Sequence, residues 1–173
     1  HFSRYYEGIF ILFNTGLRIS EFVGLTTKNI DFKHHKIIVD HQLIRSSKMQ
    51  YMIEEPKTES GVREIPMSEE VEAAFRAIIA KRVKPKVEPM IGYSGFLYLA
   101  KNNMPMVALH WEKYFQHILQ KYNSIYKVQM PKSYAPCMQT YLLLQNGKAR
   151  NESQEPAVYH GALRYQRYTE HLL

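Results

Sequence analysis

The feature of this sequence that most constrains the fold is a block of strand-forming segments, residues 36–66, set between segments of helical periodicity. β-branched and other apolar residues concentrate at 36–40, 42–44, 49–53 and 62–66. Short runs of this kind, divided by turn residues, are typical of antiparallel strands. The block therefore predicts a small antiparallel sheet of three strands with long arms, near the front of the chain.

Apolar residues on both sides of this block recur at the three- and four-residue spacing of helix faces. Helices are expected over 5–14, 18–25, 68–82 and 107–123. A Thr-Gly pair separates the first helix from the second. Ser68 is a good N-cap for the third, because two glutamates follow it in the first turn. These patterns predict an α+β domain that is mainly helical, with a small three-stranded antiparallel sheet.

Length and composition indicate one folded domain. The chain has 173 residues, of which 45% are hydrophobic and 23% charged. Its single cysteine, Cys137, excludes an intramolecular disulfide and a Cys–His zinc cluster. No apolar run approaches the roughly 18 residues of a membrane span, so we expect a cytoplasmic protein with no membrane partner. The formal net charge of +7 favours a polyanionic partner.

An arginine, Arg18, stands at a predicted helix start, after a glycine turn and three residues before Glu21. The N-terminal end of a helix repels a cation by about 0.3–1 kcal/mol, so a basic residue there requires a compensating partner. A bound phosphate is one such partner, because helix N-termini and arginine forks both favour anions. An ion pair with Glu21 on a solvated surface is the other, and on spacing alone it is the better interpretation.

The wider sequence favours the phosphate. The string TGLRISEFVGL, residues 15–25, closely resembles the first catalytic box of the tyrosine recombinase (integrase) family. The string PKTESGVREIPM, residues 56–67, resembles the β-hairpin of that family, whose lysine reaches the DNA minor groove beside the cleavage site. The resemblance extends through the predicted helix at 107–123. It implies the catalytic domain of an integrase carried by mobile genetic elements.

The resemblance implies a role for three residues of these two strings. Arg18 would contact the scissile phosphate, and Glu21 would pack behind it and help to orient the site. Lys57 would act as general acid, because its ammonium can give a proton to a departing 5′ oxygen. For a lysine in isolation a solvent-exposed side chain is the usual explanation, but the surrounding string favours the catalytic one.

The segment 131–173 departs from the family pattern. The family carries a His-x-x-Arg motif after a Pro-Lys lead, and this chain keeps only the lead. Met138 and Gln139 stand roughly where an Arg-His pair is expected. Neither can replace that pair, because methionine has no donor and a neutral amide does not neutralise phosphate charge.

The closing stretch of the chain again resembles the family. It implies that His160 donates a hydrogen bond to the phosphate and that Tyr168 is the nucleophile, with Tyr165 as the rival. An amphipathic tyrosine on a helix is the alternative for either, since the chain has 13 tyrosines. Residues 1–173 are therefore expected to be a catalytic domain that is a fragment of a longer protein. We also expect it to lack the family's N-terminal DNA-binding domains.

The implied reaction is covalent catalysis on DNA. A tyrosine oxygen attacks a backbone phosphate and leaves a 3′-phosphotyrosyl link, which a free 5′-hydroxyl reverses. Arginine forks stabilise the phosphoryl charge, so no cofactor and no metal is expected. The implied partners are double-stranded DNA and other protomers of the protein in a synaptic complex, in a bacterial host and at its nucleoid. Further DNA contacts are predicted from Lys28, Lys33, Lys48, Arg63, Lys81, Arg82, Lys84 and Lys86.

Other functions remain open at this point. The missing His-x-x-Arg motif supports a catalytically inactive recombinase-like domain that binds DNA without cutting it. A structural or interaction module with the same fold would not bind duplex DNA at low salt. A type IB topoisomerase shares the chemistry, but the two strings resemble integrases more closely.

Overall fold

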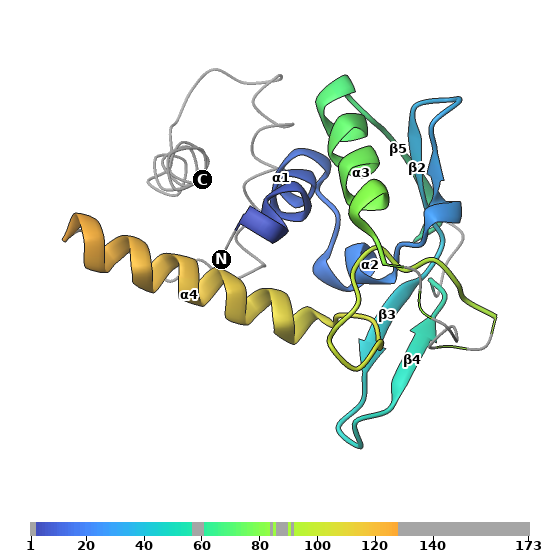
Figure 1. Ribbon diagram of the computed structural model, residues 1–173. Coiled ribbons are helices and arrows are strands. Elements are labelled where there is room, and N and C mark those ends of the chain that lie inside the picture. Colours follow the sequence, from blue (N-terminus) through green and yellow to red (C-terminus); the bar gives the residue numbers. More distant parts are fainter. Residues whose placement is uncertain (1–2, 57–60, 84, 86–89, 91, 128–173) are drawn as a thin grey trace, which may run out of the picture.

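The computed structural model describes residues 3–56, 61–83, 85, 90 and 92–127 (Figure 1). Helices are its main regular structure, and the strands are inserted between the second and third α-helices. The α-helices of the described residues are α1 (Tyr6–Thr15), α2 (Ile19–Gly24), α3 (Glu69–Lys81) and α4 (Ala108–Tyr126). Two short 3-10 helices are η1 (Ser3–Tyr5) and η2 (Thr27–Asn29). All four predicted helices are confirmed, with ends that differ by one to three residues.

The strands of the described residues form two antiparallel groups. They are β1 (Ile30–Asp31), β2 (Lys36–Val39), β3 (Gln42–Arg45), β4 (Tyr51–Glu54) and β5 (Arg63–Pro66). One sheet has the order β1-β2-β5, and β3 pairs with β4 in a separate hairpin. In the β2–β5 register, Val39 lies opposite Arg63. The predicted three-stranded antiparallel sheet is therefore present.

The membership of that sheet differs from the prediction, which placed the whole of residues 36–66 in it. Its third strand, β1, precedes that block, and β3 and β4 lie outside the sheet. The chain turns away after Val39 because the side chain of His41 is buried, with its Nε2 atom 2.8 Å from the carbonyl oxygen of Gly24. β3 therefore packs against α2 instead of continuing the edge of the sheet.

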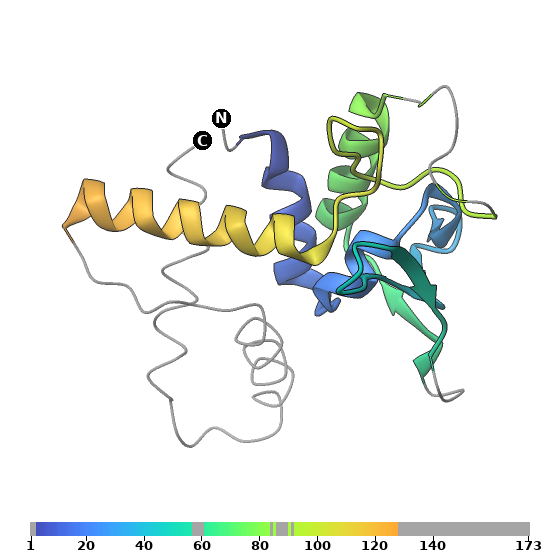
Figure 2. The same ribbon diagram turned by 90° about the horizontal axis from the view of Figure 1, so that it is seen from below.

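The core is centred on Trp111 of α4, which is fully buried. Its ring lies edge-on to the ring of Phe22 of α2, with centroids 5.1 Å apart, and edge-on to Tyr5 at 5.7 Å. Gly8 of α1 permits this packing, because a Cβ there would lie 2.4 Å from a ring carbon of Trp111. α1 thus lies between α3 and α4 (Figure 1), and the far end of α4 projects away from the strands in both views (Figure 2).

Gly24, the last residue of α2, sets how closely that helix approaches β3. A Cβ at this position would lie 2.9 Å from the backbone nitrogen of Leu43, a residue that is itself fully buried. α2 therefore rests on the backbone of β3, which cannot rotate away as a side chain can. This contact holds the short helix, and the residues at its start, in place.

Replacing Gly24 with alanine is expected to lower the free energy of unfolding by about 1–3 kcal/mol, the usual cost of overpacking a core. The higher helix propensity of alanine opposes this loss by about 1 kcal/mol at most. Chemical denaturation of the variant and the wild type measures the difference. A variant as stable as the wild type would contradict the close contact between α2 and β3.

Candidate active site

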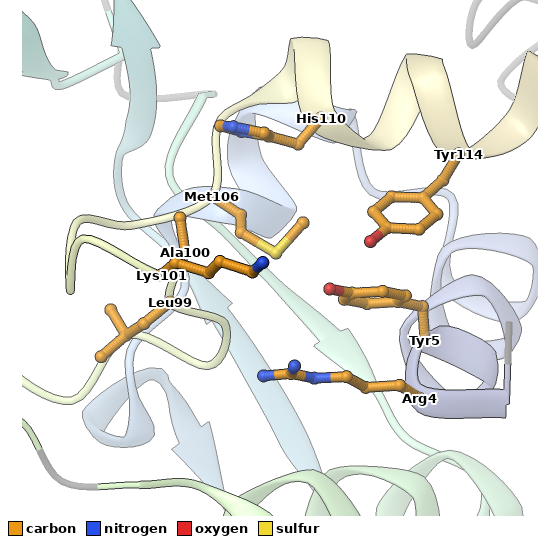
Figure 3. Close-up of a pocket in the computed structure, with 8 residues that line it drawn as sticks. All are labelled: Arg4, Tyr5, Leu99, Ala100, Lys101, Met106, His110 and Tyr114. Carbon is orange, nitrogen blue, oxygen red and sulfur yellow. The ribbon is translucent and has the colours of Figure 1, made fainter. Parts of the chain in front are cut away.

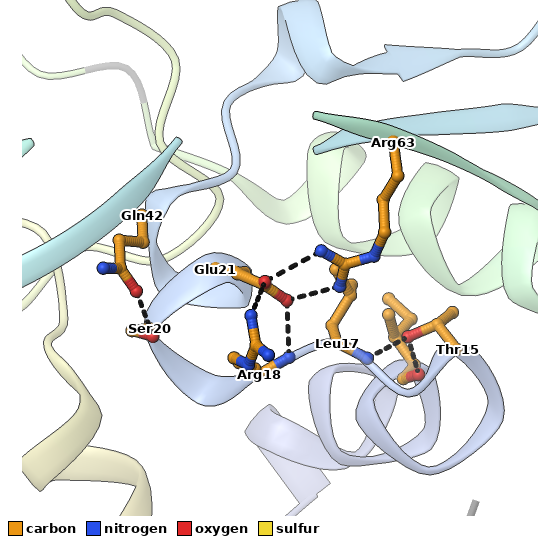
Figure 4. A network of polar contacts seen from close by, with 8 residues as sticks. Thr15, Leu17, Arg18, Ser20, Glu21, Gln42 and Arg63 are labelled. Carbon is orange, nitrogen blue, oxygen red and sulfur yellow. Dashed lines mark hydrogen bonds and ion pairs between the residues drawn. The ribbon is translucent and has the colours of Figure 1, made fainter. Parts of the chain in front are cut away.

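The site is organised around one buried carboxylate, that of Glu21, which is only 5% exposed. Its Oε2 accepts a hydrogen bond from the backbone nitrogen of Arg18 at 2.8 Å, and its Oε1 accepts one from the Arg18 Nη1 at 3.2 Å (Figure 4). The Arg63 guanidinium binds it in a bidentate manner, with Nη1 2.9 Å from Oε1 and Nη2 2.7 Å from Oε2. Both oxygens are therefore paired, as a buried charge requires.

Arg18 is the N-cap of α2 and has an extended backbone there. Its backbone N–H donates to the Glu21 carboxylate, so an acidic side chain caps the first turn of the helix. The negative charge of this carboxylate also interacts favourably with the positive end of the helix dipole. The Arg18 side chain is 62% exposed, against 34% for Arg63. The ion pair with Glu21, one interpretation of Arg18 from the sequence, is therefore present, and most of the Arg18 side chain still faces solvent.

The pKa of Glu21 follows from these contacts. Burial alone would raise it, but the hydrogen bonds from Arg63 and from the Arg18 backbone, together with the two positive charges, hold it below its usual 4.5. The same pair raises the pKa of the Arg63 guanidinium above its usual value. At neutral pH two cations thus contact one anion, so Arg18, Arg63 and Glu21 together carry one net positive charge.

A cavity of about 480 Å³ adjoins this cluster. Its lining comes from the start of α2, from the ends of β2, β3 and β4 with the residues that join or follow them, and from Gly61: Arg18, Glu21, Val39, His41, Gln42, Glu54, Glu55, Pro56 and Gly61. Lys57 itself lies outside the described residues, and Pro56 precedes it in the sequence. The structure therefore places Arg18 at the same cavity as Pro56 and Gly61, which flank residues 57–60 in the sequence.

Hydrogen bonds between polar side chains tie the walls of this cavity together. The Ser20 hydroxyl donates to the side-chain oxygen Oε1 of Gln42 at 2.9 Å (Figure 4), and the side-chain nitrogen Nε2 of Gln42 donates to Oε2 of Glu54 at 3.1 Å. His41 lines the same cavity and reaches the end of α2. These residues were not predicted from the sequence. The only sequence signal was the polar pair His41-Gln42, which lies between two strand-forming runs.

The residues predicted to contact DNA have different surroundings. Three of them are exposed: Lys28 on η2, Lys33 between β1 and β2, and Lys48 between β3 and β4. Both terminal nitrogens of Arg63, in contrast, are engaged by Glu21. In the 81–86 cluster, Lys81 donates to Glu7 at 2.6 Å, and Arg82 donates to the carbonyl oxygen of Phe96 at 2.7 Å. The remaining predicted residues lie outside the described residues: Lys57, Lys84, Lys86, His160, Tyr165 and Tyr168.

A second cavity, of about 750 Å³, shares no lining residue with the first (Figure 3). Arg4 and Lys101 extend toward the same space as the hydroxyls of Tyr5 and Tyr114 (Figure 3). Burial, followed by a hydrogen bond with Tyr5, raises the pKa of Tyr114 to about 12. Arg18, the one residue predicted to be catalytic that lies among the described residues, does not line this second cavity.

Within the ranges that the structure describes, no three His, Cys, Asp or Glu side chains come together as a metal-binding group. Among the helices of the same ranges, none combines the length and the apolar character that a bilayer-spanning segment needs.

Comparison with known proteins identifies the class of this domain. Residues 3–131 match the phage integrase family, and the chain belongs to that family, the tyrosine recombinases that its two strings resemble. The transposase of transposon Tn916 from Enterococcus faecalis is 42% identical over 130 residues. The transposase of Tn1545 from Streptococcus pneumoniae is equally similar. These alignments cover 75% of this chain but 32% of each relative, so the chain spans about a third of their length.

Solved structures give the same relationship. The Tn1549 transposon integrase in complex with circular intermediate DNA is 36% identical, with a TM-score of 0.79 over 98% of this chain and 60% of that one. The same integrase in complex with transposon right end DNA is 41% identical, with a TM-score of 0.76 over 86% of this chain and 47% of that one. The XerA recombinase, at 18% identity and a TM-score of 0.55, shares the fold. The predicted fold class and family are both confirmed.

The paired carboxylate predicts a contribution to stability that is sensitive to acid. Because the pKa of Glu21 is lowered in the folded protein, its contribution is fully present above pH of about 4.5 and is lost as the pH falls through the lowered value. Glu21→Gln is expected to lower the free energy of unfolding by about 1–3 kcal/mol at neutral pH. Urea denaturation across a pH series should show this gap narrowing in acid.

The matched control for this measurement is Glu112→Gln, which changes an exposed carboxylate on α4. Its effect on stability is expected to stay within about 0.5 kcal/mol. A gap between wild type and Glu21→Gln that is the same at acidic and neutral pH would contradict the lowered pKa.

Proposed function

We propose that this chain is the catalytic domain of a site-specific tyrosine recombinase, which cleaves and rejoins DNA strands through a 3′-phosphotyrosyl intermediate during excision and integration of a mobile element. The observation that carries the proposal is the shared cavity. Arg18, Pro56 and Gly61 line one space, and the last two flank Lys57 and its neighbours in the sequence. Arg18, Arg63 and Glu21 together carry one net positive charge. Membership of the phage integrase family supports the same chemistry.

Each proposed residue acts on one part of the scissile phosphodiester. The Tyr168 phenol gives its proton to water as its oxygen attacks phosphorus and forms the P–O bond of the 3′ link, while the bond to the 5′ oxygen breaks. Lys57 gives a proton to that leaving oxygen. Arg18 neutralises charge on the non-bridging oxygens, and His160 donates to one of them. A free 5′-hydroxyl reverses the step, so the bond energy is conserved.

The tyrosine is the most demanding part of this mechanism. Its ordinary pKa is about 10, so little of it is ionised near neutral pH. Positive charge at the phosphate compensates, because it stabilises the negative charge that develops as the tyrosine oxygen attacks. The exposed Arg18 guanidinium can supply this charge because Arg63 already neutralises Glu21.

The proposed partners are double-stranded DNA and other protomers of the same protein in a synaptic complex, on the nucleoid of a bacterial host. Solved Tn1549 integrase structures contain circular intermediate DNA or transposon right end DNA. The exposed Lys28, Lys33 and Lys48 are proposed to contact the DNA backbone. Such contacts release counterions, so the affinity is expected to fall as salt rises.

Arg18→Ala is expected to reduce the rate of strand cleavage by at least about 100-fold, the usual cost of removing a group that stabilises the transition state. Its affinity for DNA should change far less, because many residues share the phosphate contacts. Single-turnover cleavage and a binding titration on the same DNA measure the two effects.

The matched control is Arg76→Ala, because Arg76 also forms an ion pair, with Glu72, but on the outer face of α3. It should cleave like the wild type. Undiminished cleavage by Arg18→Ala would remove Arg18 from the mechanism. Wild-type protein that binds DNA but never cleaves it would instead support the inactive DNA-binding domain.

A nicked DNA substrate, from which the 5′-hydroxyl strand diffuses away, should trap the covalent intermediate on Tyr168. Peptide mass spectrometry of the adduct identifies the linked residue. Tyr168→Phe should form no adduct, and Tyr165→Phe should form it normally, since only the attacking oxygen is required. An adduct on Tyr165 or Tyr141 would overturn the assignment of the nucleophile.

A further inference from the structure

We propose that Arg63 is a positioning residue of the cleavage site, which acts through Glu21 to hold Arg18 in its working arrangement. This inference rests on the proposed function, because it explains how the guanidinium of Arg18 is presented to a phosphate. We propose this role in place of the direct DNA contact that the sequence predicted for Arg63, because both of its terminal nitrogens donate to Glu21.

The first part of the argument is the geometry of the pair. Arg63 and Glu21 are 42 residues apart in sequence, yet two nearly parallel hydrogen bonds of 2.9 and 2.7 Å join them. This fork-to-fork arrangement fixes orientation as well as distance. Arg63 is the first residue of β5, and Glu21 lies in the first turn of α2. The pair therefore sets the distance between the sheet and the helix that begins at Arg18.

The second part concerns how the charge of Glu21 is shared. The Arg18 contact, at 3.2 Å, is the longest of the side-chain bonds to this carboxylate, and the two Arg63 bonds are shorter. Because Arg63 neutralises the buried carboxylate, Arg18 is not needed for that purpose. Without Arg63, the carboxylate would hold Arg18 as its only cationic partner among the described residues. The guanidinium would then turn inward, away from a phosphate.

The third part is the link to the cavity wall. Gly61 lies two residues before Arg63, and a Cβ on it would be 2.2 Å from the Cβ of Pro56. Both residues line the cavity that Arg18 also lines. Because Arg63 joins the start of β5 to Glu21, the same ion pair holds Arg18 close to this wall.

Lysine cannot reproduce this function. It carries the same charge, but it has a single ammonium group and cannot bind both carboxylate oxygens in a fixed plane. Arg63→Lys should therefore fold with near-normal stability and still position Arg18 poorly. This variant separates positioning from folding, whereas Arg63→Ala leaves a buried carboxylate with less compensation and is expected to be less stable.

The test measures single-turnover strand cleavage at saturating DNA, together with DNA affinity and thermal stability, for Arg63→Lys and Arg63→Ala. We expect the cleavage rate to fall at least tenfold in both variants while the DNA dissociation constant changes less than threefold. Arg76→Lys and Arg76→Ala are the matched controls and should cleave normally. A variant of Arg63 that binds DNA weakly but cleaves at the wild-type rate when saturated would overturn the proposal in favour of a DNA contact.

A double-mutant cycle with Arg18→Lys identifies the route of the effect. If Arg63 acts through Arg18, Arg63→Lys should reduce cleavage much less in the Arg18→Lys background than in the wild type. Equal reductions in the two backgrounds would show that Arg63 acts independently of Arg18 and would overturn the proposal.

A readout without catalysis separates this inference from the proposed function. If the wild-type protein fails to cleave DNA, the proposed function fails, but the position of Arg18 can still be measured. The NMR signal of the Arg18 Nε–H group should shift in Arg63→Lys and remain unchanged in Arg76→Lys. An unchanged Arg18 signal in Arg63→Lys would overturn the positioning role whatever the activity of the protein.

Discussion

The arrangement of this domain depends on a buried negative charge, the carboxylate of Glu21. A carboxylate removed from water destabilises a protein unless it is paired and hydrogen-bonded. Here the hydrogen-bond donors that pair with the carboxylate come from two elements, the start of α2 and the first residue of β5. The electrostatic requirement of one side chain therefore joins two parts of the fold that are far apart in sequence. It also leaves a positive charge on the surface, beside a cavity.

Much of the fold could be predicted from sequence because its signals are local. Helix faces repeat every three or four residues, and the Ser68 hydroxyl accepts from the Val71 backbone as an N-cap of its type does. The division of the strands between two groups was not predictable in this way. It depends on the burial of His41 against the end of α2, which is a tertiary contact. Residue types alone do not specify which neighbour a short strand will pair with.

The candidate site also has one part with a local sequence signal and one part without. Arg18, the residue proposed to act on the phosphate, could be found because it lies in a contiguous string with Glu21. The partner of that glutamate could not, because Arg63 is 42 residues away and reads in sequence as one more surface cation. The same applies to Lys81 and Arg82, which have partners within the chain. Positive residues in a basic protein are therefore poor guides to a ligand until their internal partners are known.

The position of Trp111 has a practical consequence. It is the single tryptophan of the chain, it is fully buried, and its indole ring lies edge-on to Phe22 of α2. Indole emission responds to the polarity and packing of its surroundings, so the protein contains an intrinsic fluorophore next to the helix that carries the candidate site. Without any label, emission from this one ring can separate loosening of α2 from events on the outer surface.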